Sequence, residues 1–72
     1  MNEYSRIIIE RYCREHPRTK KSVILSHLVE MSYDLSYEPS DQEALDLERI
    51  ISREKDPELL EAIQDLDDFL FC

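Results

Sequence analysis

Three prolines, Pro17, Pro39 and Pro57, divide the 72-residue chain into four blocks of similar length. Proline lacks a backbone N–H and clashes with the preceding helical turn, so it ends a helix or lies in its first turn. The chain contains no glycine, the residue on which hairpin turns and many helix C-caps depend. These two features favour helices joined by short turns, and no block shows the two-residue alternation of a half-buried strand.

Each block repeats its apolar residues at helical spacing. Helices are therefore expected over residues 3–16, 20–36, 41–54 and 57–70. We predict one all-α domain spanning residues 1–72, either a small four-helix bundle or an orthogonal arrangement of helix pairs. The residues expected to face the core are Tyr4, Ile8, Ile9, Tyr12 and Cys13, then Ile24, Leu25, Leu28, Met31 and Leu35, then Ala44, Leu47, Ile50 and Ile51, and finally Leu59, Ala62, Ile63, Leu66, Phe69 and Leu70.

Polar residues occur where each helix is expected to begin. Asn2, Thr19 and Asp56 have side chains that accept hydrogen bonds from the first N–H groups of a helix. Ser40 and Glu43 have the three-residue spacing of a capping box, in which each side chain satisfies the other residue's backbone N–H. The sequence therefore predicts an N-cap for every helix.

Composition limits the class of protein. Hydrophobic residues make up 42% of the chain, enough for a core, and charged residues make up 36%. A domain this short buries only about 60% of the surface that its unfolded chain exposes, so we expect modest stability. No run approaches the 18 or so apolar residues of a membrane span, and the first residues lack the apolar region of a signal peptide. We expect a cytoplasmic protein with no membrane partner and with reduced cysteines.

Charge is unevenly distributed along the sequence. Residues 1–21 carry six basic and three acidic side chains, whereas residues 22–72 carry three basic and fourteen acidic ones. The net charges are +3 and −11, which sum to the −8 of the whole chain. In the last helix Glu58, Glu61, Asp65 and Asp68 follow each other at steps of three or four residues. They form an acidic stripe on one side of that helix.

The stripe has three interpretations. It is a solvated helix face, or it pairs with the basic residues between 11 and 21, or it docks on a basic partner protein. We favour docking and predict a small acidic protein-binding module that acts as a regulator, inhibitor or adaptor, because long-range attraction would guide it to a basic surface. The predicted partner-binding residues are the four acids Glu58, Glu61, Asp65 and Asp68, together with the apolar residues Phe71 and Ile7.

Two alternatives remain open. The first is a nucleic-acid-binding regulator that resembles a helix-turn-helix, although the net charge of −8 repels phosphate. The second is a homodimeric assembly protein, in which Phe71 and Cys72 contact a second copy. The nucleic-acid alternative would use the basic residues Arg11, Arg14, Arg18, Lys20 and Lys21.

Metal and catalytic motifs are weak. Cys13 and His16 form a C-x-x-H pair that His27 and Cys72 could complete, but the spacing is not that of a zinc finger. Cys13 and His16 also lack the glycine-rich loop or pocket that a nucleophilic cysteine enzyme requires. We therefore expect no metal, no cofactor, no catalytic residue and no enzymatic activity.

Overall fold

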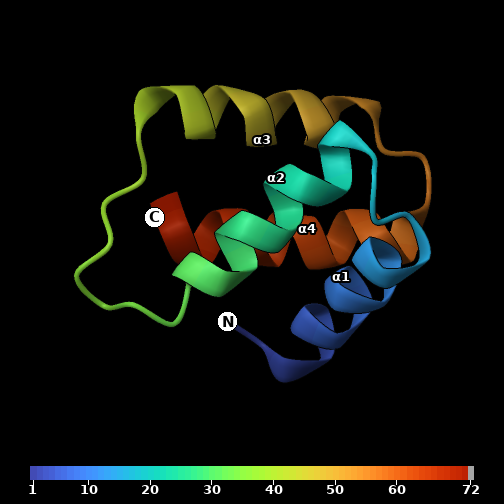
Figure 1. Cartoon of the computed structure of the whole chain (residues 1–72), viewed down its shortest axis with the longest axis horizontal. Helices are drawn as coiled ribbons and strands as arrows, with labels where there is room; N and C mark the ends of the chain where they lie inside the picture. The colour runs from blue at the N-terminus through green and yellow to red at the C-terminus, as the bar shows by residue number, and fades with distance from the viewer. Residues whose placement is uncertain (72) are drawn as a thin grey trace.

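The computed structural model describes residues 1–71, which contain four α-helices and no strand (Figure 1). The helices are α1 (Glu3–Glu15), α2 (Lys20–Met31), α3 (Asp41–Arg53) and α4 (Pro57–Phe71). They pack against one another as a small bundle measuring 29 × 23 × 22 Å. The predicted all-α fold is thereby confirmed.

Side chains cap the N-termini of the helices, as the sequence predicts. Each cap accepts a hydrogen bond from an N–H group that has no partner within its own helix. The capping box between Ser40 and Glu43 is complete in both directions. The acceptors Asn2, Thr19, Ser40 and Asp56 receive these bonds from the N–H groups of Tyr4, Ser22, Glu43 and Glu58, at distances of 2.8, 3.1, 3.1 and 3.1 Å.

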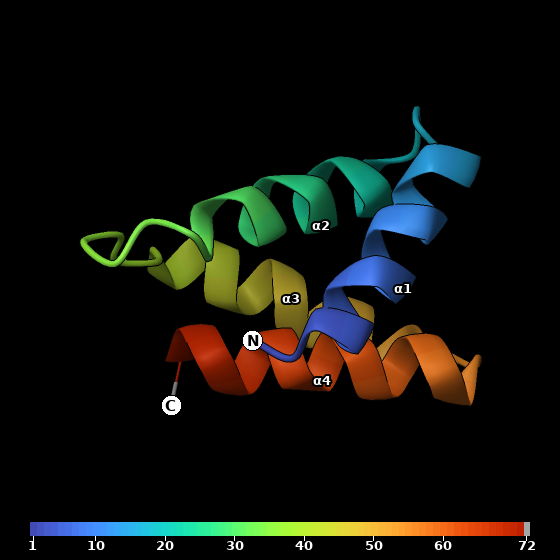
Figure 2. The same ribbon diagram turned by 90° about the horizontal axis from the view of Figure 1, so that it is seen from below.

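The helices are arranged so that the bundle has two distinct ends. Helices α3 and α4 run in opposite directions along the long axis, and α1 lies obliquely across α4, the helix with which it packs most extensively (Figures 1 and 2). The α1–α2 turn and the α3–α4 connection lie at one end of the bundle (Figure 2). The α2–α3 connection and the last turns of α4 lie at the other.

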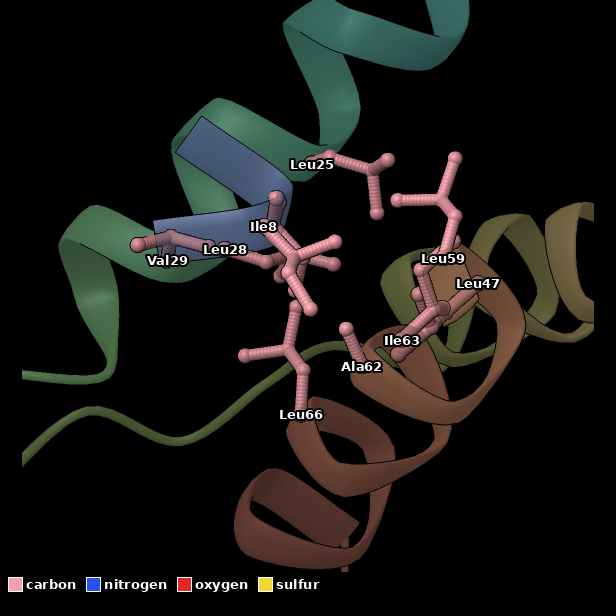
Figure 3. Close-up of a cluster of buried hydrophobic side chains, with 10 residues drawn as sticks. Ile8, Leu25, Leu28, Val29, Leu47, Leu59, Ala62, Ile63 and Leu66 are labelled. Carbon is pink, nitrogen blue, oxygen red and sulfur yellow. The ribbon is translucent and has the colours of Figure 1, made fainter. Parts of the chain in front are cut away.

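The core lies where the four helices meet. Side chains of α4 point toward those of α1 and α2 (Figure 3). Burial of such side chains supplies most of the free energy that offsets the ordering of the chain. Within the described residues, the buried apolar side chains are Ile8, Ile9, Leu25, Leu28, Val29, Leu47, Leu59, Ala62, Ile63 and Leu66.

The second helix is shorter than predicted, because it ends at Met31 and not at residue 36. Asp34 Oδ1 accepts hydrogen bonds from the N–H of Ser36 at 3.0 Å and from its hydroxyl at 2.7 Å. Such a local turn competes with helical hydrogen bonds. The prediction that Leu35 belongs to the core face of this helix was wrong, since Leu35 is 96% exposed.

Three aromatic residues also lie elsewhere than predicted. Tyr4 is mostly exposed, and its hydroxyl donates a hydrogen bond to Glu58 instead of its ring packing in the core. Phe69 was expected beside the core and Phe71 outside it, but Phe69 is exposed and Phe71 packs partly buried against the core. The apolar spacing of the sequence is correct for α4 as a whole. The spacing does not determine whether Phe69 or Phe71, both near the end of the helix, is buried.

Candidate protein-binding surface

The two ends of the bundle have opposite charge. The segments 11–21 and 49–55 contain eight of the nine Lys and Arg residues of the chain, and the helix packing brings these segments together (Figure 2). We call them the basic end. The segments 30–45 and 65–71 contain eight acidic residues and no Lys or Arg, and they meet at the opposite end (Figure 2). We call them the acidic end.

Apolar side chains are exposed at the acidic end. Tyr33 is 64% exposed, Leu35 96% and Phe69 45%, and we call these three the apolar patch. They line a hollow of about 440 Å³ between the α2–α3 connection, α1 and α4, together with Met1, Glu3, Arg6 and Ser32. Contiguous exposed apolar surface bounded by polar residues is typical of sites that bind other molecules. The acidic end therefore combines charge with apolar area.

Hydrogen bonds hold the α2–α3 connection against α3. The hydroxyl of Tyr37 donates to Glu43, whose carboxylate also accepts from the N–H of Ser40 at 2.8 Å. The Ser40 N–H and then the Tyr37 hydroxyl lower the pKa of Glu43 to about 2. Burial, and then Glu43, raise the pKa of Tyr37 to about 12. These bonds fasten the part of the connection that follows Leu35 to the first turn of α3.

Like charges adjoin between α3 and α4. Burial raises the pKa of Asp67, and the carboxylates of Asp68 and Glu48 raise it further. A raised pKa for a carboxyl group means that its negative charge is unfavourable in the folded protein. Asp67 and Asp68 belong to the acidic end, and Glu48 on α3 extends its negative charge. A basic partner would relieve this repulsion.

Part of the predicted acidic stripe interacts within the molecule. Glu58 accepts from Arg11 at 3.1 Å and from the Tyr4 hydroxyl at 2.9 Å. The sequence left open whether the stripe pairs with the basic residues, and for Glu58 it does. Glu61 is exposed on the same helix and forms neither a hydrogen bond nor an ion pair within residues 1–71. Of these two acids, Glu61 is the one whose charge can act on another protein.

The other predicted binding residues differ in how accessible they are. Asp65 is half-buried and accepts a hydrogen bond from the N–H of Asn2 at 3.1 Å. Asp68 is exposed in the acidic end. Ile7 is 47% exposed on α1, outside the apolar patch, and Phe71 packs partly buried against the core. Phe69 is the more accessible aromatic residue of α4, and helical spacing alone did not identify it.

The five predicted nucleic-acid-binding residues fall into two groups. Arg11 pairs with Glu58, and Lys21 forms an ion pair with Glu54. The remaining three are exposed and form no ion pair with any described residue. These three are Arg14, Arg18 and Lys20.

Two arginines of α3 adjoin the basic residues of α2. Arg49 and Arg53 line a groove between α2 and α3 together with Lys20 and Lys21. Spacing along α3 did not reveal this grouping, because Asp46 lies three residues before Arg49 and so has the spacing to pair with it. Counting the charged residues near each end of a helix, and not along each face, would have identified this group of cations.

Cys13 is a half-buried free thiol. Its Sγ–H donates to the carbonyl oxygen of Ser22 at 3.4 Å, and burial, followed by Glu10, raises its pKa. A thiol with a raised pKa is a poor nucleophile at neutral pH. Within residues 1–71, no three His, Cys, Asp or Glu side chains are grouped as metal ligands. Cys72, the fourth member of the weak metal motif, lies outside the described residues.

Of the helices described, none has the length and apolar content needed to cross a membrane. Comparison with known proteins assigns no relative, since no family model, curated protein or solved structure matches the chain.

Proposed function

We propose that the protein is a small, non-catalytic protein-binding module of the cytoplasm, a regulator, inhibitor or adaptor. It docks through its acidic end on a basic surface of another protein. One observation carries this proposal: the exposed apolar patch adjoins segments 30–45 and 65–71, which contain eight acidic residues and no Lys or Arg. Arg6 of α1 also lines the hollow beside the patch, but it forms ion pairs with Glu3 and Glu10.

The two components of this surface have different roles. The carboxylates attract a basic surface over several ångströms and raise the association rate, whereas the apolar patch is desolvated in the complex and slows dissociation. Leu35 is almost fully exposed. Burying a leucine side chain completely is worth about 1.5–3 kcal/mol, so Leu35 is the strongest candidate for an anchor. Phe69 replaces Phe71 as the aromatic anchor, and Glu61 and Asp68 contribute to attraction.

Direct nucleic-acid binding through residues 11–21 is a weaker proposal. Arg11 and Lys21 already pair with Glu58 and Glu54, which leaves fewer cations for phosphates. The net charge of −8 opposes it as well.

The proposal is tested first by affinity capture of the tagged protein from its native host, with identification of the captured protein by mass spectrometry. The purified partner is then titrated in a calorimeter at low and high salt. Binding should weaken as salt rises, and the double variant Leu35→Ala, Phe69→Ala should weaken it at least tenfold, about 1.4 kcal/mol.

The matched control is Val23→Ala, which also removes an exposed apolar side chain but lies on α2 outside the acidic end. Affinity should change less than twofold for this variant. Equal affinities for wild type, the Leu35, Phe69 double variant and the Val23 control would refute the proposed surface.

A further inference from the structure

The groove between α2 and α3 is a second candidate site, at the opposite end from the apolar patch. We call it the basic groove. Its volume is about 230 Å³, and the half-buried side chains of Ile24 and Ile50 that line it also pack against the core. One acid, Asp46, lies among its cations and accepts a hydrogen bond from Gln42 at 2.9 Å. The groove is lined by Lys20, Lys21, Ile24, Asp46, Arg49, Ile50 and Arg53.

Most cations of the basic groove have no partner in the molecule. Lys21 pairs with Glu54, and its ammonium lies 4.6 Å from the centre of the Tyr12 ring. Lys20, Arg49 and Arg53 form no ion pair within residues 1–71. The cations that lie beside one another in the groove repel. This local repulsion exists even though the net charge of the whole chain is −8. An anionic ligand would relieve this repulsion.

The apolar side chains in the groove indicate the kind of ligand. The groove has two isoleucines with cations around them. A complementary ligand would therefore present an apolar side chain with carboxylates on either side. A groove of about 230 Å³ has room for one large apolar side chain. An exposed turn can present such a side chain together with neighbouring carboxylates.

The chain itself carries a segment of this description. Leu35 is 96% exposed, Asp34 and Glu38 lie near it in sequence, and the connection that holds all three projects from the opposite end of the bundle (Figures 1 and 2). Asp34 is ionised more readily than an ordinary aspartate, because the Ser36 hydroxyl and then the Ser36 N–H lower its pKa.

We propose that the basic groove of one molecule binds the α2–α3 connection of a second copy, with Leu35 of that copy against Ile24 and Ile50. Its carboxylates, Asp34 and Glu38, then adjoin the three unpaired cations. This inference rests on the proposed function, since it uses the acidic end and names a second copy as one partner. The two contact surfaces differ and lie at opposite ends, so the association is head-to-tail and can continue beyond a dimer.

Sedimentation equilibrium of the purified full chain under reducing conditions tests this proposal. At low salt the average mass should rise above the 8.6 kDa of the monomer as the concentration increases from micromolar to millimolar. Salt at about 1 M shortens the Debye length to about 3 Å and should return the mass toward that of the monomer. Leu35→Ala should reduce self-association at least tenfold.

Charge reversal tests the pairing of the two surfaces. Arg49→Glu with Arg53→Glu changes the net charge from −8 to −12, and Asp34→Lys with Glu38→Lys changes it from −8 to −4. All four residues are exposed, so both variants should fold, which circular dichroism can verify. Each variant alone should be monomeric, and a mixture should associate. Both variants are negative overall, so opposite net charge would not explain association of the mixture.

The outcomes separate this inference from the proposed function. A wild-type protein that is monomeric at every concentration, while its acidic end still binds a foreign partner, overturns the head-to-tail contact alone. Self-association that neither charge reversal weakens also overturns it. A monomeric wild type that shifts a labelled oligonucleotide, with the shift lost in the Arg49, Arg53 variant, would assign the groove to nucleic acid instead.

Discussion

Lys21, in the first turn of α2, forms an ion pair with Glu54, the C-cap residue of α3. The Glu54 side chain is only 8% exposed, and its carboxylate also accepts from the N–H groups of Lys55 at 3.2 Å and Asp56 at 3.1 Å. The Lys21 ammonium lies over the Tyr12 ring of α1. One pair of side chains thus connects α1, α2 and the α3–α4 connection.

Glu54→Gln should therefore lower the free energy of unfolding. Burial opposes ionisation of Glu54, but Lys21 and the two N–H groups outweigh it, so its pKa is lowered. Hydrogen bonds to charged groups contribute about 1.5–3 kcal/mol, and partial exposure of Lys21 reduces the expected loss to about 1–2 kcal/mol. Urea denaturation at neutral pH measures it. Glu15→Gln, at an exposed acid of the same end, is the control, and an equal loss for both variants would contradict the prediction.

Loss of the α3 cap should also be measurable. Ser40→Ala removes the acceptor for the Glu43 N–H and should cost about 1 kcal/mol of unfolding free energy. Ser52→Ala is the control, because Ser52 is exposed and bonds only to the Arg49 carbonyl in the last turn of the same helix. The Ser52 variant should stay within about 0.5 kcal/mol of wild type. Similar midpoints for both variants in thermal denaturation would show that the capping box contributes little.

Acid should destabilise the protein in a window set by Glu43. The pKa of this residue is about 2 in the folded protein and 4.5 ordinarily, so folding favours its ionised form. Its contribution is fully present above about pH 4.5 and is lost as the pH falls toward about 2. Chemical denaturation at several pH values should show a smaller loss over that window for Glu43→Gln than for wild type. If the free energy of unfolding fell equally with pH in wild type and in Glu43→Gln, Glu43 would not be the cause of the acid destabilisation.

Asp67→Asn should stabilise the protein at neutral pH. The pKa of Asp67 is raised by burial, Asp68 and Glu48, so its ionised form is unfavourable in the folded state. Removing the charge should gain a few tenths of a kcal/mol, comparable to one like-charge pair on a helix. The gain should shrink as the pH falls through the pKa of Asp67, because wild type then becomes protonated. Glu61→Gln is the control on the same helix, and a larger gain from it would contradict this account.

Two leucines should respond very differently to truncation. Leu47 is fully buried, and Leu47→Ala should cost about 2–5 kcal/mol. A chain of this length has about 4–11 kcal/mol of stability in total, so this variant should lose a large share of its free energy of unfolding. Leu35→Ala should change stability by less than about 0.5 kcal/mol, because Leu35 contacts almost nothing. A large destabilisation by Leu35→Ala would mean that the Leu35 side chain is buried and would contradict this prediction.

Local features of the fold were predictable because they depend on neighbouring residues. The caps at Asn2 and Ser40 follow from hydrogen bonds that reach only two or three residues along the chain. The end of α2 was not predictable from apolar spacing, since Leu35 continues the helical pattern while Asp34 and Ser36 form a competing turn.

The charged ends could be predicted only in part. The net charges of residues 1–21 and 22–72 already indicated segregation. However, Arg49 and Arg53 join the basic residues of α2 only because the direction and packing of α3 bring them there. Similarly, the pairing of Glu58 with Arg11 depends on how α1 crosses α4. Neither relation is encoded in the spacing within one helix.

The extensive packing of α1 against α4 has a consequence for biosynthesis. Helix α4 is the last of the described helices to leave the ribosome, and it supplies four of the buried core residues, Leu59, Ala62, Ile63 and Leu66. A nascent chain that ends before α4 therefore exposes the apolar sides of α1, α2 and α3 to solvent and to chaperones. Stable structure should form only after translation has passed α4, and shorter translation products should be degraded.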